Sequence, residues 1–285
     1  MNLNKEQLET FHRNGYLLIE NVFCTEELAL IEAEILRLKQ IDCQERILEK
    51  DGSVRSFFAP EKQSNILGLV TRLKKMVKPA ESILDNQVYI HQSKLNTKQA
   101  FIGDKWDWHQ DYIFWQKDDG MPSPDVLNAM IYVNEVNEFN GPLFVIPGSH
   151  LLGVVEDTAA GKSMENESEW FKKYQQSKSY MSALTVNLKY TINQQTVTEW
   201  VDKNGIRSTN GAAGSVLFFH GNIFHASPSN VSPWNRDTFL VTYNSTDNKL
   251  KDIENPRPTF IANRDFTPIK TIDDSSLLDL AGNKA

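Results

Sequence analysis

Two places in the sequence carry side chains that could bind a metal ion. His109 and Asp111 lie two residues apart, and His220 and His225 follow far downstream. In a β-strand, residues i and i+2 point to the same side, so the imidazole of His109 and the carboxylate of Asp111 could converge on one ion. Two histidines and one carboxylate form a facial triad on iron(II), which leaves coordination positions open for a chelating cosubstrate and oxygen.

These spacings do not by themselves identify the metal or the chemistry. A His-X-Asp sequence arises often by chance, and a single histidine is more often a structural residue than a ligand. Zinc also accepts two histidines and a carboxylate. The residues alone therefore leave three classes of protein open: an iron oxygenase, a zinc hydrolase, and a metal-binding module without catalytic activity.

Short motifs surround the candidate ligands, and their order along the chain is more informative than any one of them. They are Gln92-Ser93-Lys94-Leu95-Asn96, Trp108-His109-Gln110-Asp111 with Trp115, Asp119-Gly120-Met121-Pro122, Asn140-Gly141-Pro142-Leu143, Val145-Ile146-Pro147-Gly148-Ser149-His150, His225-Ala226-Ser227-Pro228 with Arg236, and Tyr243-Asn244-Ser245. This ordered set resembles the phytanoyl-CoA dioxygenase family of Fe(II)/2-oxoglutarate-dependent oxygenases, and within it the ectoine hydroxylase branch. With Gly15-Tyr16, the resemblance covers roughly residues 15–265.

The resemblance implies a fold that is mainly β with flanking helices, the double-stranded β-helix or cupin-like jelly roll. It also implies that His109, Asp111 and His225 hold the iron and form the catalytic centre. Halogenating relatives in the family lack the carboxylate ligand, whereas this chain retains it as Asp111. The implied reaction is therefore hydroxylation of an unactivated carbon.

His220 competes with His225 for the third ligand position. The family's distal histidine is followed by a small residue and then by serine, and His225 matches this pattern with Ser227. Arg236 lies eleven residues beyond His225, as the family pattern requires. Both matches favour His225.

The resemblance implies 2-oxoglutarate and O2 as cosubstrates. The keto-acid end of 2-oxoglutarate would chelate iron, and its distal carboxylate would need an anchor inside the barrel. The planar guanidinium of Arg236 suits that role because it can form two parallel hydrogen bonds with a carboxylate; the alternative is a surface arginine in a charged neighbourhood. Ser227, Asn128 and Lys94 are further candidates for cosubstrate binding, although Asn128 replaces a serine of the ectoine enzymes.

Four residues match positions that form the substrate pocket of ectoine hydroxylases: Gln92, Trp115, Phe219 and Leu240. Aromatic walls with one amide suit a small, partly polar molecule, although the aromatic residues could instead belong to the core. Leu240 replaces a phenylalanine of the ectoine enzymes, which widens the expected site. A free amino acid or a derivative of one is therefore the expected substrate, with ectoine itself as the alternative.

Composition excludes several other kinds of function. The 285 residues are 40% hydrophobic and carry a net charge of −7 without a dense basic run, so nucleic acid is not an expected partner. No apolar stretch approaches the length of a membrane helix. Cys24 and Cys43 are expected to be free thiols, which indicates the cytoplasm. A monomer and a homodimer remain equally open.

The elements that must position these residues are predicted from periodicity and turn signals. A single domain over residues 1–285 is expected, with helices over 4–15, 25–40 and 63–76, the second of them capped by Thr25. Residues 151–213 are polar and read as an insertion, either a surface excursion or a lid over the active site. Strands are expected over 16–23, 87–95, 129–135, 143–146, 215–219 and 238–243, with His109 and Asp111 in a further strand.

Overall fold

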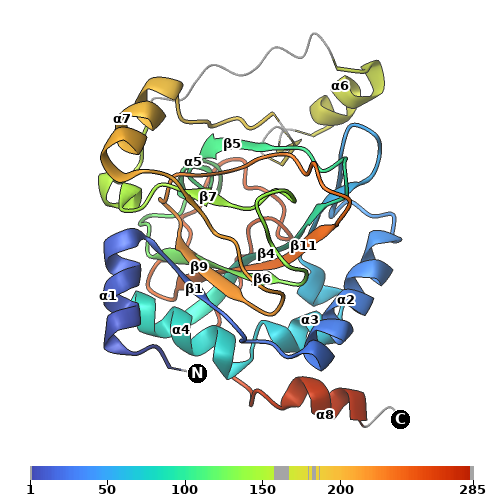
Figure 1. Ribbon diagram of the computed structural model, residues 1–285, viewed down its shortest axis with the longest axis vertical. Coiled ribbons are helices and arrows are strands. Elements are labelled where there is room, and N and C mark those ends of the chain that lie inside the picture. The colour runs from blue at the N-terminus through green and yellow to red at the C-terminus, as the bar shows by residue number, and fades with distance from the viewer. Residues whose placement is uncertain (1, 157–166, 179, 182–183, 186, 283–285) are drawn as a thin grey trace.

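Two antiparallel sheets lie at the centre of the protein (Figure 1). The computed structural model describes residues 2–156, 167–178, 180–181, 184–185 and 187–282. The larger sheet has the order β1-β9-β6-β11-β4-β3-β2, with bounds Tyr16–Ile19, Val216–His220, Val126–Tyr132, Arg236–Ser245, Val88–Lys98, Val54–Phe58 and Arg46–Leu48. The smaller sheet has the order β5-β10-β7-β8, with bounds Trp106–His109, His225–Ser227, Phe144–Val145 and Arg207–Ser208. This is the expected jelly-roll arrangement.

The strands of the larger sheet present two different faces because side chains alternate along a strand. In β11, Phe239, Val241 and Tyr243 belong to a core cluster shared with the helices. Leu240, between them in sequence, belongs to a second cluster. Arg236, four residues before Leu240 and on the same face, lines a cavity together with it. One face of the sheet thus supports the fold, and the other lines a potential site.

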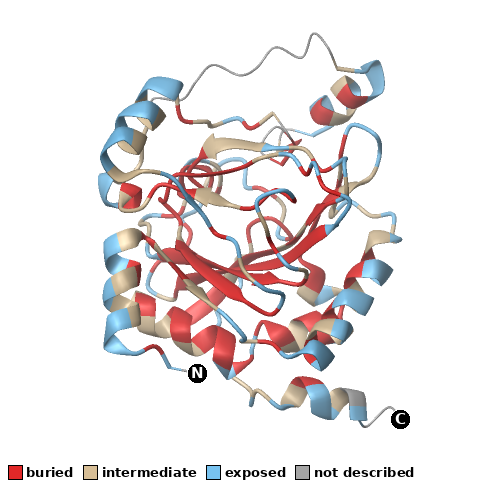
Figure 2. Cartoon of the chain, viewed as in Figure 1, coloured by how far each residue is buried: buried red, intermediate tan, exposed pale blue. Residues whose placement is uncertain are grey.

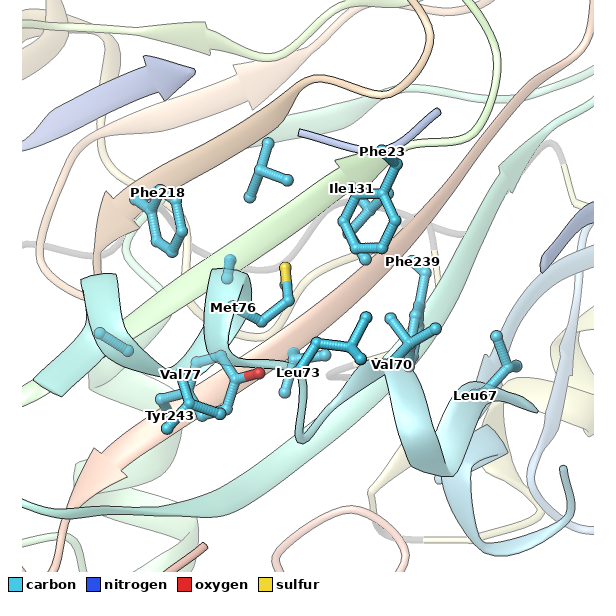
Figure 3. Packing of buried hydrophobic residues seen from close by; sticks show 14 of the residues in the cluster. Phe23, Leu67, Val70, Leu73, Met76, Val77, Ile131, Phe218, Phe239 and Tyr243 are labelled. Carbon is cyan, nitrogen blue, oxygen red and sulfur yellow. The ribbon is translucent and has the colours of Figure 1, made fainter. Parts of the chain in front are cut away.

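Helices cover the outer face of the larger sheet. Leu67, Val70 and Met76 from these helices pack with Ile131 and Phe239 of the sheet (Figure 3). Burial in Figure 2 is concentrated in the central strands of the larger sheet and on the helix faces turned toward it. The helices of this layer are α1 Lys5–Asn14, α2 Thr25–Lys39, α3 Asn65–Val70, α4 Lys74–Leu84 and α8 Ser276–Gly282.

The helix predicted over 63–76 is wrong, because the structure has two helices in this region. α3 ends at Val70, and α4 begins at Lys74 and continues to Leu84. Between them, Ile272 donates its N–H to the carbonyl of Arg72 and accepts the N–H of Lys74. This pairing with a segment far along the chain uses backbone groups that a continuous helix would need. No local sequence pattern predicts it.

Two other boundaries also differ from the prediction. The N-cap of α2 is Cys24 rather than Thr25, and its N–H donates to the side chain of Glu27 at 3.0 Å. The strand predicted over 16–23 ends at Ile19, because Asn21 adopts a positive φ of 57°. Cys24 and Cys43 are free thiols, as predicted.

The five strands predicted from 87 onward are all present, with shifted ends. The strands β2 and β3 were not predicted. β2 has only three residues and carries Arg46 at its start, so it lacks a clear alternating pattern. Short edge strands of this kind depend on a partner strand rather than on their own sequence.

Of the described parts of residues 151–213, the two helices lie on the side of the smaller sheet away from the helical layer (Figure 1). These parts contain α6 Glu169–Gln176, α7 Gln194–Asn204 and β8, and Figure 1 places α6 and α7 beyond β5 and β7. Phe171, Leu184 and Leu188 are buried in this region. Residues 157–166, 179, 182–183 and 186 of the predicted insertion lie outside the described residues. None of the described helices is long and apolar enough to span a membrane.

Candidate metal centre and active site

His109, Asp111 and His225 come together in the folded chain. One nitrogen of each imidazole and one oxygen of the carboxylate all lie within 4.8 Å of one another. The Nε2 atoms of His109 and His225 are each 3.6 Å from an oxygen of Asp111, and the two ring centroids are 4.1 Å apart. All three side chains are largely buried. This donor set fits a ferrous ion with two histidines and one carboxylate.

The backbone brings the three ligands together differently from the prediction. β5 ends at His109, and Asp111 lies beyond it with helical angles (φ −68°, ψ −38°), immediately before α5 Tyr112–Asp119. The prediction that His109 and Asp111 share a strand is therefore wrong. The side chain of Gln110 donates to the carbonyl of Asn222, which fixes the turn between them. His225 opens β10 and pairs directly with His109 across the smaller sheet.

Backbone carbonyl groups orient both histidines. Nδ1 of His109 lies 2.6 Å from the carbonyl oxygen of Asp107, and Nδ1 of His225 lies 3.0 Å from that of Ile223. A carbonyl oxygen can only accept, so Nδ1 carries the proton in each ring and Nε2 keeps a lone pair for a metal. Burial, reinforced by His109, lowers the pKa of His225 to about 4, which keeps its imidazole neutral at pH 7.

The third ligand, Asp111, is fixed by a chain of hydrogen bonds from the larger sheet. Asn128 on β6 donates to Oδ2 of Asp111 at 2.8 Å and accepts from Thr242 on β11 at 2.6 Å. Burial raises the pKa of the Asp111 carboxyl, but the charges of His225 and neighbouring groups outweigh this effect, and the pKa falls below its usual range. The carboxylate is therefore ionised and held in one orientation, as a metal ligand must be.

Arg236 lies on the same cavity as the three ligands. This cavity, called here the Arg236 cavity, has a volume of about 420 Å³. The guanidinium is 4% exposed, and its hydrogen bonds go to the hydroxyls of Thr238 and Ser227, both at 3.4 Å. Nε has no partner, and no carboxylate of the described residues forms an ion pair with it. Burial lowers the pKa of Arg236 to about 10, so it stays charged at pH 7 and lacks an anion.

The family profile of phytanoyl-CoA dioxygenase (PhyH) matches residues 11–238. The chain belongs to the phytanoyl-CoA dioxygenase family. An ectoine dioxygenase from Bordetella bronchiseptica is 35% identical over 97% of this chain and 88% of its own length. An L-proline trans-4-hydroxylase from Streptomyces griseoviridis is 33% identical over 92% of this chain and 94% of its own length.

Solved structures agree with this assignment. EctD from S. alaskensis with 2-oxoglutarate and 5-hydroxyectoine has a TM-score of 0.78, 26% sequence identity, and coverage of 95% of this chain and 88% of EctD. The form of EctD with bound Fe has a TM-score of 0.76, the same identity and the same coverage. The protein is thus a 2-oxoglutarate-dependent dioxygenase with the double-stranded β-helix fold, and its cofactors are iron and 2-oxoglutarate.

The residues fit both cofactors of this dioxygenase. His109, Asp111 and His225 would hold the iron. Arg236, charged and without an anion, fits the distal carboxylate of 2-oxoglutarate. When bound, the iron and 2-oxoglutarate supply the oxidising power, and the protein supplies position and charge.

His220, the other candidate for the third ligand, lies elsewhere. Its Nδ1 accepts the N–H of Asn222 at 3.0 Å, and its ring centroid is 5.1 Å from that of His150. Burial is the main cause that lowers the pKa of His220 to about 3. This histidine is partly buried and does not join the metal ligands.

A second cavity of about 400 Å³, called here the Arg257 cavity, adjoins the first. Lys94, Trp106, His109 and Asp111 line both cavities. The remaining residues of the Arg257 cavity are Phe58, Gln92, Phe114, Trp115, Leu184, Leu188 and Arg257. One side of the iron site therefore faces Arg236, and the other faces a small chamber with mixed apolar and polar walls.

The structure divides the four residues predicted to contact substrate between the two cavities. Gln92 and Trp115 line the Arg257 cavity. Phe219 and Leu240 line the Arg236 cavity instead, together with Ser227. The replacement of phenylalanine by Leu240 therefore changes the wall near Arg236, not the wall beside Gln92.

The predicted cosubstrate residues are also divided. Ser227 lines the Arg236 cavity, and Lys94 lines both cavities. Asn128 is not among its lining residues and is bonded to Asp111 and Thr242. In the described structure, Asn128 therefore supports a metal ligand.

Sequence reasoning missed Arg257, the only arginine on the second cavity among the described residues. Its Nε and Nη2 donate to the two oxygens of Asp119 at 2.7 and 2.6 Å. Nε2 of His91 lies 3.3 Å from the same carboxylate. Asp119 stood in a recognised motif, but Arg257 lies in a loop without regular structure and had no local signal.

Proposed function

We propose that this dioxygenase hydroxylates an unactivated carbon of a small amino acid or amino-acid derivative bound in the Arg257 cavity. The observation that carries the proposal is that a guanidinium and a fixed amide share this cavity with the iron ligands His109 and Asp111. These two groups match the carboxylate and the N–H group of such a substrate. The carbon between or beside them would then face the iron.

Arg257 supports recognition of a carboxylate. Asp119 takes its Nε and Nη2 edge, and Nη1 has no hydrogen-bond partner among the described residues. Arg257 as a whole residue is 9% exposed, so an anion at Nη1 would bind with little competition from water. The ion pair with Asp119 also prevents the side chain from turning away.

Gln92 supports recognition of an N–H group. Its Nε2 donates to the carbonyl of Ile261 at 2.6 Å. Because a carbonyl oxygen can only accept, the amide nitrogen must face Ile261, which leaves the amide oxygen as an acceptor for the cavity. Apolar walls from Trp115, Leu184 and Leu188 suit the hydrocarbon part of the substrate.

Two named relatives agree with this substrate class. One is an ectoine dioxygenase and the other an L-proline trans-4-hydroxylase, and both ectoine and proline are small cyclic molecules with one carboxylate and ring nitrogen. Ectoine hydroxylation is the second candidate, favoured by the greater identity of the ectoine enzyme. A zinc hydrolase is disfavoured, because hydrolysis has no use for the buried, unpaired charge of Arg236.

The experiment is a screen for succinate release with iron(II), 2-oxoglutarate and O2 over proline, other free amino acids and ectoine. We expect at least one amino acid to stimulate succinate formation and to gain one oxygen atom. Asp111→Ala should abolish turnover, whereas Asp42→Ala, an exposed residue outside the two cavities, should retain oxygenase chemistry. Stimulation by ectoine alone would reject a free amino acid as the substrate in favour of ectoine hydroxylation. Full turnover by Asp111→Ala would reject the metal site.

We also propose that residues 151–213 are an insertion within a single domain and act as a lid on the Arg257 cavity. Leu184 and Leu188 support this, because both are buried and line that cavity. The reducing cytoplasm is the proposed compartment, in keeping with the free thiols of Cys24 and Cys43.

A further inference from the structure

Trp106 forms part of the wall of both cavities, and its indole has a buried cation against its face. The guanidinium carbon of Arg55, on β3, lies 3.7 Å from the centroid of the Trp106 ring. Nζ of Lys94 lies 5.9 Å from the same centroid. Cation–π contacts favour such arrangements, most strongly where water is excluded. Arg55 is 1% exposed, so the cation is shielded from water, whereas the indole of Trp106 is partly buried.

Arg55 is itself held tightly. Its Nη1 donates to the buried carboxylate of Glu49 at 2.7 Å, and its Nη2 donates to the carbonyl of Lys105 at 2.9 Å. Glu49 also accepts the N–H of Asp104 at 3.2 Å. The Glu49–Arg55 pair therefore fixes the backbone on both sides of Lys105 and the ring of Trp106 that follows it.

Stability alone does not explain the buried Glu49–Arg55 ion pair. A buried ion pair often contributes no more than an apolar pair of the same volume, because both charges lose their hydration. Nε of Arg55 is also buried without a hydrogen-bond partner, which carries a further cost. What an apolar residue could not supply is a flat, charged surface for the indole together with a donor for the carbonyl of Lys105.

The position of Trp106 indicates what the flat guanidinium of Arg55 contributes to. Its indole lines the cavity of Arg236 and the cavity of Arg257, next to the ligands His109 and Asp111. An indole that could rotate would merge the two chambers and admit water beside the iron site. A fixed indole keeps the volume around 2-oxoglutarate constant.

We propose that Arg55 is a positioning residue for 2-oxoglutarate: stacked on Trp106, it fixes the indole as the shared wall between the two cavities. Arg55 acts through Trp106 and does not line either cavity itself. The inference depends on cosubstrate binding, which is a property of the family, and is independent of the identity of the hydroxylated substrate.

The test is anaerobic titration of the iron(II)-loaded protein with 2-oxoglutarate, followed by the visible charge-transfer band of the complex. We expect Arg55→Met to weaken 2-oxoglutarate binding about tenfold, the effect of losing a desolvated cation–π contact that orders the wall. Iron(II) affinity should change less than about twofold. Arg13→Met, an exposed arginine on α1, is the matched control and should match wild type.

A double-mutant cycle separates positioning from charge. If Arg55 acts through Trp106, Arg55→Met should add less than about a twofold effect in a Trp106→Leu background. Arg55→Lys, which keeps the charge but not the flat face, should remain impaired. An equal effect of Arg55→Met with and without Trp106, or wild-type affinity in Arg55→Lys, would overturn the proposal.

The 2-oxoglutarate titration can be interpreted even if one variant fails to fold or the hydroxylated substrate is not identified. If Arg55→Met is not recovered folded by circular dichroism, Arg55→Lys is titrated alone, and an unchanged 2-oxoglutarate affinity rejects the proposal. Because the titration needs no hydroxylated substrate, a failure of the amino-acid screen leaves this result intact.

Discussion

At the scale of single residues, the metal site depends on groups that never touch the metal. Asp107 and Ile223 set the tautomers of the two histidines through their carbonyls, and Asn128 holds the carboxylate of Asp111. Such supporting hydrogen bonds orient metal ligands, and losing them weakens metal binding.

Asn128→Ala should therefore lower iron(II) affinity by about 10- to 100-fold. The change removes the donor to Asp111 and leaves the hydroxyl of Thr242 without its acceptor. Competition with a chromogenic chelator measures the affinity. Asn86→Ala is the control and should keep wild-type affinity, because Asn86 lies between α4 and β4 and donates to Ser245 at the end of β11. If iron(II) bound Asn128→Ala as tightly as wild type, Asn128 would not support the site.

A second prediction at this scale concerns Asp119, which orients Arg257. Asp119→Asn removes the charge that holds Nε and Nη2, so the guanidinium can turn away from the cavity. We expect KM for a carboxylate substrate to rise at least about tenfold, with a smaller change in kcat. Affinity for 2-oxoglutarate should stay the same, because Arg236, its proposed anchor, does not line the Arg257 cavity. A fall in kcat at unchanged KM would contradict this role.

At the scale of elements, α5 links three parts of the active site. Asp111 precedes its first residue, Trp115 lines the Arg257 cavity, and Asp119 ends it beside Arg257. Asp118 accepts a hydrogen bond from Lys189 at 2.8 Å. A single short helix thus connects the iron ligand, the substrate wall and the region around Leu188.

The leucines of that region should set substrate size. Leu184→Ala and Leu188→Ala enlarge the Arg257 cavity without removing a polar contact. We expect kcat/KM for the best small substrate to fall about 10-fold or more, and larger analogues to improve relative to it. Steady-state kinetics over an analogue series measures the change. Leu151→Ala, an exposed leucine, is the control. An unaltered size preference in both variants would exclude contact with substrate.

At the scale of the whole molecule, the two sheets contribute different residues to the site. The smaller sheet supplies His109 and His225, and the larger sheet supplies Arg236. The cost of bringing them together is burial of polar and ionisable groups, including His220. Such groups make the stability of the fold depend on pH.

His220 predicts the direction of this dependence. Burial lowers its pKa from 6.5 to about 3, so between these values the unfolded chain binds a proton that the native protein does not. Stability therefore falls as pH drops through this window. His220→Asn keeps an acceptor for the N–H of Asn222. Between pH 7 and pH 5, its free energy of unfolding should fall by about 2 kcal/mol less than that of wild type. Urea unfolding of the metal-free proteins at both pH values tests this; parallel losses would contradict it.

The sequence by itself determined the fold class, because ordered motifs along the chain resemble those of the family. The same motifs predicted the triad of His109, Asp111 and His225, which meets in the folded chain, and Arg236, which lines the same cavity. Local periodicity also placed α1 and the central strands β4, β6, β9 and β11. These features depend mainly on near neighbours in the chain.

Only the tertiary structure decided how Asp111 reaches the metal from beyond the strand, and which residues form the second cavity. Arg257, Leu184 and the stack of Arg55 on Trp106 come from separate loops and strands. Their roles follow from which distant segments meet and exclude water. The spacing of residues along the chain does not show which distant segments come into contact, because burial and contact are properties of the packed molecule.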